Sequence, residues 1–452
     1  MRLRRLAAAT AVALLAGTAL AACSSGGTGE TTAANVVPKL NPDQKVEIVF
    51  ESYNLTQAGV WTDTVNQLLS EFQTANPNIT VKAQAPQGTG PAGSNTVQSV
   101  QTQLLAGSAP DVAQLTFDAL EFTATQLGAK PISDIVSKEE LEEAFGGKNP
   151  MHPNARVLAD WEGKTVGMPY VFSTPVLFYN ATLFASAGLP ADVDLSTWDA
   201  VEKAGKQISA KTGKPALEMA CTLPGGNWCM QGVFQSNGAQ VLSDDRKTIE
   251  FGSPEAVATV ERFAEMKEAG VLSSAAVAAQ LENVMKGESA MIVNSSALQG
   301  MLLQSAAAGG WKLAAAPLPA FPGKEAVPTN SGSALFVLSS DPAKQRASWE
   351  LIKFLTSDRA YELISSKIGY LPLRTGLVEE GGALYDWAQS NPLIKPNLEQ
   401  LNRMKPWVSY PGNSYSQVDT LLANAIEEAI YFGGDAKKLL SEAATRAQGL
   451  IK

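Results

Sequence analysis

Histidine and cysteine are scarce in this chain of 452 residues, which contains one histidine, His152, and three cysteines. A metal site built on several histidines is therefore excluded, and a Ser-His-Asp catalytic triad could use only His152. Basic residues are also in the minority, since 35 Lys and Arg stand against 44 Asp and Glu, a formal net charge of −9. A nucleic-acid-binding surface needs clustered Lys and Arg to displace counterions, so this balance argues against one.

The overall composition is that of a globular protein, with 45% hydrophobic and 17% charged residues. Collagen-like, coiled-coil and mostly disordered chains are excluded on this ground. At roughly 100–200 residues per domain, the length predicts two to four domains or lobes. Beyond the N-terminal segment, no stretch approaches the roughly 18 uninterrupted apolar residues expected of a membrane-spanning helix.

The N-terminal segment has the layout of an export signal. Arg2, Arg4 and Arg5 precede an apolar run over residues 6–20, which is shorter than the roughly 20 residues that span a membrane. The sequence Leu-Ala-Ala-Cys23 that follows resembles the bacterial lipoprotein signal. This resemblance implies that residues 1–22 are removed and that Cys23 carries the lipid; a plain signal peptide with a chance cysteine is the alternative. Residues 23–44 begin with a Ser-, Gly- and Thr-rich stretch and are expected to form a flexible tether.

The other two cysteines, Cys221 and Cys229, are eight positions apart. In an exported protein, such an isolated pair is most simply a disulfide, with two free buried thiols as the alternative. A metal site at this pair is disfavoured because the chain offers no histidine partner for it.

Short apolar stretches alternate with helical ones from residue 46 onward. Strands are predicted over 46–50, 79–85 and 112–115, and helices over 60–76 and 96–106. This β-α-β pattern predicts a mainly parallel sheet covered by helices.

Two motifs suggest chemistry that their context does not support. Gly88 to Gly93 match the dinucleotide-binding pattern G-x-G-x-x-G, but Pro91 removes one phosphate-facing N–H and an exported protein meets little NAD. The segment from Asp192 resembles a calcium loop, but Thr197 occupies its glycine position. Neither motif therefore indicates a cofactor or a metal.

Four later segments follow one another in an order and spacing that are hard to obtain by chance. They are WEGKTVGMP (161–169), STPVLFYN (173–180), KGESAM (286–291) and SKIGYLPLR (366–374). Together they resemble the extracellular solute-binding proteins of ABC importers, in the group that includes the maltose-type sugar binders. The resemblance extends from about residue 45 to the C-terminus and is strongest over residues 160–375.

This resemblance implies an α/β, two-lobed fold of the periplasmic-binding-protein type (class II), with a ligand cleft between lobes that a hinge joins. We expect residues 45–170 and 290–332 in lobe 1, and residues 171–289 and 333–452 in lobe 2. Binding a ligand across both lobes would favour the closed state, which the membrane permease then recognises. No reaction is expected, so the chain is predicted not to be an enzyme and to need no cofactor.

Within this group, STPVLFYN and GYLP most resemble the glycerol-3-phosphate and glycerophosphodiester binders. Carried over residue by residue, the resemblance and the aromatic and polar residues around it predict ligand contacts from Glu51, Ser52, Asp118, Ser173, Trp228, Ser295, Gly332, Tyr370 and Tyr410. Aromatic rings suit the C–H faces of a sugar or polyol, and hydroxyls and carboxylates suit its hydroxyl groups. Phe117 could stand in place of Asp118. Each of these side chains could instead serve the fold alone.

One departure from the group concerns phosphate. The arginine expected shortly before the last helices aligns with Tyr410. A buried phosphomonoester needs charge-assisted donors such as a guanidinium. A neutral sugar, a polyol or a phosphodiester should therefore bind better than glycerol-3-phosphate, unless Arg374 or Arg403 substitutes.

The sequence thus predicts the substrate-binding lipoprotein of an ABC importer, held by its lipid at the outer face of the bacterial cell membrane. Its expected partners are a small sugar, polyol or glycerophosphodiester and the permease subunits, and we expect a monomer without nucleic acid or metal. A secreted enzyme acting on carbohydrates or phosphodiesters, and a ligand-binding sensor, are the alternatives.

Overall fold

The computed structural model describes residues 36–56, 59–88 and 92–451. The expected signal peptide over residues 1–22, the lipidated Cys23 and tether residues 23–35 lie outside the described residues. Residues 36–44, which were counted with the tether, run along the first of two lobes: the Val37 N–H donates to the Ile135 carbonyl over 2.8 Å, and Val37 and Leu40 pack on the core. These apolar side chains give the segment a surface to bury, which the Ser- and Gly-rich residues before it lack.

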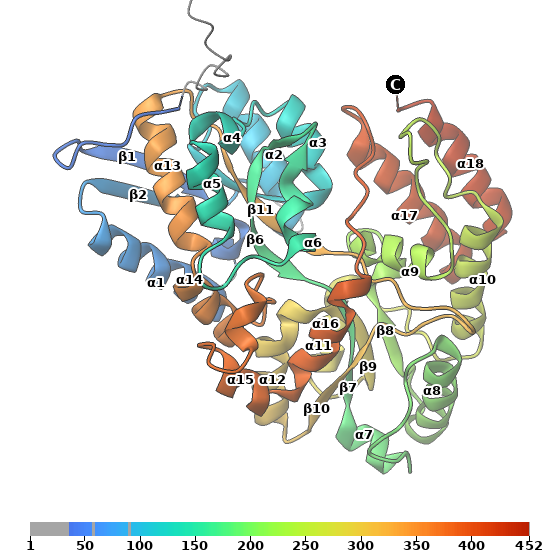
Figure 1. The fold of residues 1–452 in the computed structure, drawn as a ribbon. Coiled ribbons are helices and arrows are strands. Elements are labelled where there is room, and N and C mark those ends of the chain that lie inside the picture. Colours follow the sequence, from blue (N-terminus) through green and yellow to red (C-terminus); the bar gives the residue numbers. More distant parts are fainter. Residues whose placement is uncertain (1–35, 57–58, 89–91, 452) are drawn as a thin grey trace, which may run out of the picture. The chain divides into compact units, whose positions relative to one another are not determined.

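The first sheet has the order β2 (Ile79–Gln84), β1 (Val46–Glu51), β3 (Val112–Thr116), β11 (Ser331–Val337) and β6 (Gly167–Ser173). Strand β1 pairs in parallel with β2 and β3, whereas β11 pairs antiparallel with β3 and β6. In β1 the alternating Val46, Ile48 and Phe50 are buried, as the period of a strand requires. Helices α1 (Val60–Ala75), α2 (Ala92–Leu105) and α13 (Pro342–Leu355) pack on this sheet to form the first lobe (Figure 1).

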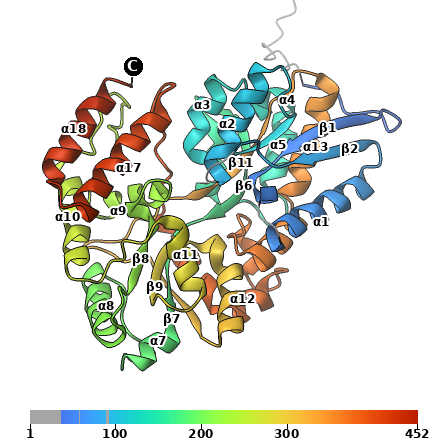
Figure 2. The same cartoon turned by 180° about the vertical axis from the view of Figure 1, so that it is seen from behind.

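The second sheet has the order β10 (Leu313–Pro317), β7 (Pro175–Asn180), β9 (Met291–Ser295) and β8 (Leu217–Met219). Alternate residues of β9 enter two cores, because Met291 and Val293 pack on one face and Ile292 on the other. The larger core lies under α8 (Trp198–Thr212), α10 (Pro254–Glu268), α17 (Tyr415–Tyr431) and α18 (Ala436–Gln448); the smaller lies under α11 (Val277–Met285) and α12 (Gln299–Gly309). Both views show α10, α17 and α18 side by side on this second lobe (Figures 1 and 2).

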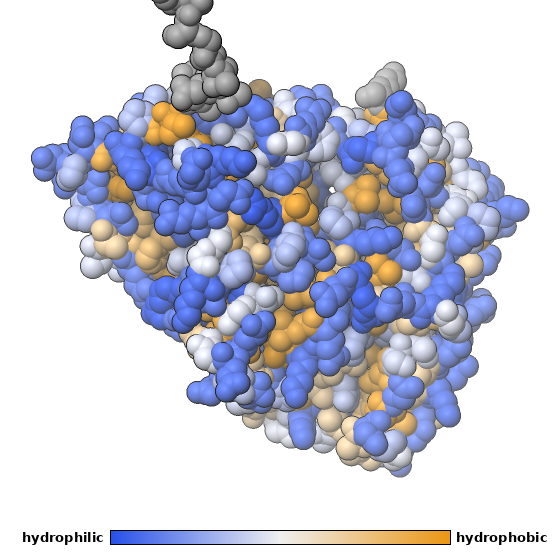
Figure 3. Space-filling model, viewed as in Figure 1, coloured by the Kyte–Doolittle hydropathy of each residue, from blue (hydrophilic) through white to orange (hydrophobic). Residues whose placement is uncertain are grey.

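The remaining elements are short and connect or cover the two sheets. They are α3 (Leu120–Thr125), α4 (Ile132–Ile135), α5 (Lys138–Phe145), α6 (Pro153–Arg156), β4 (Asp160–Trp161), β5 (Lys164–Thr165), α7 (Ala181–Ser186), α9 (Met230–Ser236), α14 (Asp358–Leu363), α15 (Tyr385–Ser390) and α16 (Lys395–Gln400). Hydrophilic residues dominate the face shown in Figure 3, where hydrophobic residues form separate patches. In the part of the chain that the structure describes, no helix combines the length and apolarity that crossing a membrane requires.

Strand pairing corrects two of the expectations. Residues 290–332 were assigned to the first lobe, but β9 and β10 belong to the second sheet; residues 333–452 were assigned to the second, but β11 belongs to the first sheet. The sheets are also mixed rather than mainly parallel, because β7, β10 and β11 all pair antiparallel with their neighbours. Such long-range pairings leave no local pattern in the sequence, which is why the β-α-β alternation did not predict them.

The two sheets meet at their carboxyl-terminal edges. Strand β6 ends at Ser173 and β7 starts at Pro175, so the chain passes from the first sheet to the second through one residue, Thr174. Further crossings precede β11 and lie between Met404 of the first core and Tyr410 of the second. Short 3-10 turns follow the strand ends here: Tyr53–Thr56, Phe117–Ala119, Ala220–Thr222 and Ser296–Leu298. Any polar side chain in these turns is therefore brought towards the junction between the lobes.

Candidate solute-binding site

A buried polar network joins the ends of three strands of the first sheet. The Ser52 hydroxyl, just after β1, donates to Gln114 Oε1 of β3. Gln114 Nε2 in turn donates to the Ser333 hydroxyl of β11 over 2.8 Å, and the Tyr53 hydroxyl donates to the same oxygen over 3.1 Å. Of these side chains, only Ser52 was predicted from the sequence.

Aromatic rings border this network. The ring centroids of Tyr370 and of Trp61, at the start of α1, lie 5.3 Å apart, and the two ring planes are tilted by 60°. Burial raises the pKa of Tyr370 well above its usual value, so its hydroxyl stays a neutral donor. Among the described residues, none hydrogen-bonds to Trp61 Nε1 or to either amide atom of the buried Asn54. A buried polar atom without a partner is costly, so a role in packing alone does not account for these atoms.

Two serines meet at the crossing between the lobes. The Ser295 hydroxyl, at the end of β9, donates to the Ser173 hydroxyl, at the end of β6, over 2.8 Å. In β11, Gly332 has φ +124°, and a Cβ added to it would lie 2.0 Å from the Val171 carbonyl oxygen. The close approach of β11 to β6 therefore requires glycine here, because any side chain would force the strands apart. Ser173, Ser295 and Gly332 thus lie close to one another at the crossing.

The Glu51 side chain is held inside the first lobe by hydrogen bonds from two glutamines. Its Oε2 atom accepts hydrogen bonds from Gln84 Nε2 and from Gln103 Nε2, each over 2.6 Å. This places one carboxylate oxygen against β2 and α2, within the first lobe. The other oxygen, Oε1, is buried and has no partner among the described residues.

Asp118 and Tyr410 lie where the second lobe faces the turn after β3, and Trp228 lies on the core of the second lobe. The Ser409 hydroxyl donates to the backbone carbonyl of Asp118 over 2.7 Å, which sets Tyr410 beside that turn. The Tyr410 ring is buried edge-on against Phe251, at a centroid distance of 6.3 Å. Trp228 is half-buried on the core of the second lobe, next to the disulfide that joins Cys221 and Cys229. Both aromatic side chains therefore pack on the core of the second lobe.

A salt bridge connects the two lobes beside the turn that follows β3. Arg246 of the second lobe donates from Nη2 to Glu121 Oε2 of α3 over 2.5 Å and to the Ser409 carbonyl over 3.0 Å. Its guanidinium also lies 5.4 Å from the ring centre of Trp161, in the first lobe. The Gly412 N–H donates to the other oxygen of Glu121 over 3.1 Å. We call these contacts the interlobe clasp.

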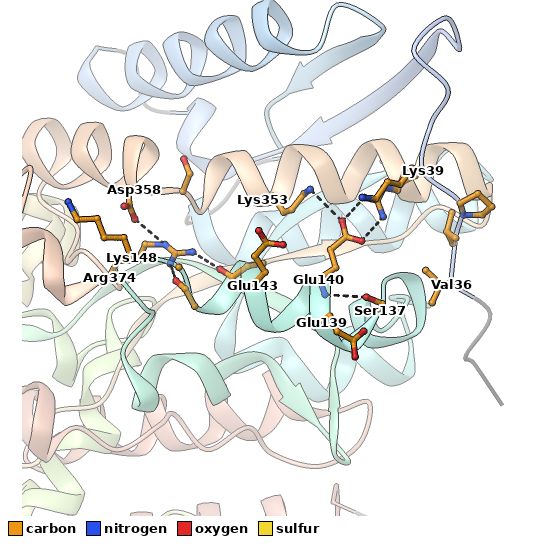
Figure 4. Close-up of a pocket in the computed structure, with 17 residues that line it drawn as sticks. Val36, Lys39, Ser137, Glu139, Glu140, Glu143, Lys148, Lys353, Asp358 and Arg374 are labelled. Carbon is orange, nitrogen blue, oxygen red and sulfur yellow. Dashed lines mark hydrogen bonds and ion pairs between the residues drawn. The ribbon is translucent and has the colours of Figure 1, made fainter. Parts of the chain in front are cut away.

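Both arginines considered as phosphate partners donate to backbone carbonyls. Arg374 is buried and donates to four backbone carbonyls, those of Ala144, Gly146, Asn149 and Thr356, over 2.5–2.9 Å. It borders a groove of about 770 Å³ between α5, α13 and residues 36–39 (Figure 4). Arg403 donates from Nη1 to the Ala326 carbonyl over 3.0 Å. The Arg374 guanidinium, which four backbone carbonyls surround, serves the fold, so the suggestion that it replaces the missing arginine is not supported.

Sequence reasoning missed several polar and aromatic side chains of the first lobe: Tyr53, Asn54, Trp61, Gln114 and Ser333. It also missed a pair in the second lobe, where Asn227 Nδ2 donates to both carboxylate oxygens of Asp419 over 2.8 and 2.9 Å. Gln114 carried a signal, since it is a polar residue within the otherwise apolar strand VAQLT. Asp419 carried none, because an acid on a helix is usually solvated.

The fold and this arrangement define a two-lobed solute-binding protein. The chain belongs to the family of bacterial extracellular solute-binding proteins, whose family model matches residues 67–396. It is 26% identical over 308 residues to the sn-glycerol-3-phosphate-binding periplasmic protein UgpB of Brucella melitensis biotype 1, covering 64% of this chain and 68% of that protein.

Two solved structures share the fold. UgpB from Mycobacterium tuberculosis, in complex with glycerophosphocholine, superposes with a TM-score of 0.76 at 19% identity, covering 90% of this chain and 98% of that one. Maltose-bound MalE3 of T. maritima superposes with a TM-score of 0.74 at 20% identity, covering 89% and 99% of the two chains.

Proposed function

We propose that this chain captures a neutral carbohydrate, a polyol or a glycerophosphodiester outside the membrane and delivers it to the permease of an ABC importer. The observation that carries the proposal is the gathering of buried polar and aromatic side chains at the carboxyl-terminal edges of both sheets. The serine pair at the crossing belongs to both lobes, since Ser173 ends β6 of the first sheet and Ser295 ends β9 of the second.

The chemistry of these side chains suits hydroxyl-rich ligands. Tyr370 and Trp61 offer flat apolar faces, and the unpartnered Asn54 amide offers both a donor and an acceptor to one solute. The serine hydroxyls can each donate and accept. A sugar or polyol presents the complementary pattern of C–H faces and hydroxyl groups.

Charge supports a ligand without a phosphomonoester. Arg374 is held by four backbone carbonyls, Arg403 donates to the Ala326 carbonyl, and Arg246 is paired with Glu121. A dianion buried without a guanidinium partner would lose several kcal/mol relative to water. The relatives' names mention glycerol-3-phosphate and glycerophosphocholine, and of these two the diester carries the smaller negative charge.

Binding is proposed to couple to the permease through closure of the lobes. A solute that contacts both sheets stabilises the closed arrangement, in which the interlobe clasp also forms. The lipid on Cys23 would hold the protein at the membrane near its permease. Replacing Cys23 with Ala should release the protein from washed membranes or stall its processing, and a variant that stayed bound would exclude the lipid anchor.

A thermal-shift panel of sugars, polyols and glycerophosphodiesters, followed by calorimetric titration of the hits, tests the proposal. Replacing Tyr370 with Ala should raise the Kd about 10- to 100-fold, which is typical of a buried aromatic anchor. Tyr370→Phe keeps the packing and tests the hydroxyl alone, and Tyr385→Ala on α15 is the matched control. A panel without any hit, or a folded Tyr370→Ala variant that binds like wild type, would overturn the proposal.

A further inference from the structure

The first crossing between the lobes is made by a buried threonine. Thr174 is the one residue between β6 and β7, and it is fully buried. Its hydroxyl donates to Asn397 Oδ1 over 2.6 Å and accepts from Gln400 Nε2 over 2.8 Å. Its carbonyl accepts from the Ser296 N–H over 3.1 Å. The residue through which the chain passes between the sheets is therefore held by both its side chain and its backbone.

Gln400 ties this crossing to the second sheet. Its Nε2 atom also donates to the Pro175 carbonyl, at the start of β7, over 2.8 Å. Its Oε1 atom accepts from the Leu318 N–H, directly after β10, over 3.0 Å. Asn397 and Gln400 are three positions apart on α16, so both amides lie on the same face of this helix. One face of α16 thus fastens the crossing to two neighbouring strands.

The surroundings of α16 do not explain why this face is polar. Leu393, just before the helix, packs in the smaller core of the second lobe, and Leu401, just after it, packs in the core of the first. Asn397 and Gln400 are fully buried between them, where apolar side chains would avoid the cost of burying amides. Among the described residues, none hydrogen-bonds to Asn397 Nδ2, so the contribution of this amide is the bond from Thr174 to its oxygen. Hydrogen bonds weaken steeply when their geometry changes, so buried amides fix a position more strictly than apolar contacts do.

The serine pair of the candidate site lies directly beside this crossing. Ser173 precedes Thr174 in the chain, and Ser295 precedes Ser296, whose N–H donates to the Thr174 carbonyl. The bond between the two serine hydroxyls, over 2.8 Å, is therefore one residue away from this backbone hydrogen bond. A displacement of Thr174 would change the spacing of the two hydroxyls.

We propose that Asn397 and Gln400 act as positioning residues of the solute site by holding Thr174 in place. Through Thr174, they keep the hydroxyls of Ser173 and Ser295 at the spacing in which both bind one solute. This inference rests on the solute-binding function proposed above, and it adds two residues that do not need to touch the solute. Because the crossing also has to bend when the lobes move, the same two amides favour one arrangement of the lobes.

Thr174→Val tests the proposal, because valine keeps the shape of the side chain and removes its hydroxyl. We would titrate sorbitol, maltose and glycerophosphocholine by calorimetry, well below the melting temperature. For each probe that the wild type binds, Kd should rise at least about tenfold in Thr174→Val and in Gln400→Met. Thr174→Ser restores the hydroxyl and should bring Kd back to within about twofold of the wild-type value.

Thr259→Val is the matched control. Thr259 is also fully buried, and its hydroxyl likewise donates to one group and accepts from an amide: it donates to the Glu255 carbonyl over 2.7 Å and accepts from Asn237 Nδ2 over 3.0 Å. The control should lose stability as Thr174→Val does and keep the wild-type Kd. A folded Thr174→Val variant with the wild-type Kd, or an equal rise in Kd for Thr259→Val, would overturn this inference while leaving solute binding in place.

Hydrogen exchange of the Ser296 N–H provides a measurement that needs no solute. In the empty protein, and relative to the amides of β1, this N–H should exchange at least about tenfold faster in Thr174→Val than in the wild type. The relative rate should be unchanged in Thr174→Ser and in Thr259→Val. An unchanged rate in Thr174→Val would overturn the inference whether or not any probe binds. If the three probes and the wider panel give no hit, the proposed function fails, and the exchange rate alone decides whether the crossing is held as proposed.

Discussion

Glu121→Gln should weaken solute binding without touching the solute or destabilising either lobe. Glu121 accepts hydrogen bonds from Arg246 Nη2 over 2.5 Å and from the Gly412 N–H over 3.1 Å, and both donors belong to the second lobe. The substitution keeps the shape of the side chain and removes its charge. If these bonds form only when the lobes close, the variant loses free energy in the closed state alone.

The size of the effect follows from the exposure of the pair. The Arg246 side chain is 35% exposed and that of Glu121 14% exposed, so the ion pair is partly screened. A charge-assisted hydrogen bond contributes about 1.5–3 kcal/mol when buried and less than about 1 kcal/mol at the surface, which places this pair near 1–2 kcal/mol. Each 1.4 kcal/mol corresponds to a tenfold change in Kd, so we expect a rise of roughly 5- to 30-fold.

Calorimetric titration of wild type and variant with the same solute measures this rise, and thermal unfolding of the empty protein checks the lobes. Glu142→Gln is the matched control, because Glu142 pairs with Arg156 inside the first lobe, where Arg156 Nη1 donates to Glu142 Oε2 over 2.9 Å. Kd should be unchanged in the control. A Glu121→Gln variant with the wild-type Kd, or one whose melting temperature falls as its affinity does, would refute closure through the clasp.

Three other substitutions have defined outcomes. Gly332→Ala should lower the free energy of unfolding by at least about 3 kcal/mol, seen in chemical denaturation, since its Cβ would meet the Val171 carbonyl oxygen; wild-type stability would contradict the strand geometry. Replacing both Cys221 and Cys229 with Ser removes the disulfide and should lower the free energy of unfolding by roughly 2–3 kcal/mol. The melting temperature of this variant should no longer depend on reductant, and continued dependence would mean that another thiol matters. Burial raises the pKa of Asp419 in the folded state to about 6, above its value in the unfolded chain. The free energy of unfolding of the wild type should therefore fall relative to that of Asp419→Asn by about 1–2 kcal/mol as pH rises from about 4 to about 6. A difference between the two proteins that does not change with pH would show that this carboxyl is not buried.

The two-lobed fold was predictable because ordered motifs extend over most of the chain, even though each is weak alone. The assignment of strands to lobes was not, because β11 crosses back to pair with β3 and β6, more than 150 residues earlier in the sequence. Antiparallel pairing over such a separation leaves no periodic signal. The short strand β9 was misassigned for the same reason.

In the candidate site, Ser173, Ser295 and Gly332 were identified from sequence motifs, and the fold places them close together. Residues whose role depends on an opposing lobe escaped prediction. Asp419 looks in the sequence like any acid on a helix, and only the fold brings it to Asn227, whose Nδ2 donates to both of its carboxylate oxygens. Arg374 shows the converse: its charge suggested a phosphate partner, yet four backbone carbonyls surround its guanidinium.

A crystal structure of the mature protein with its solute tests the central claim most directly. The account predicts electron density for the solute at the carboxyl-terminal edges of both sheets, in contact with Tyr370 and the Ser173–Ser295 pair and with the interlobe clasp closed beside it. Solute bound instead in the groove between α5 and α13, or to one lobe alone with the serine pair untouched, would contradict it.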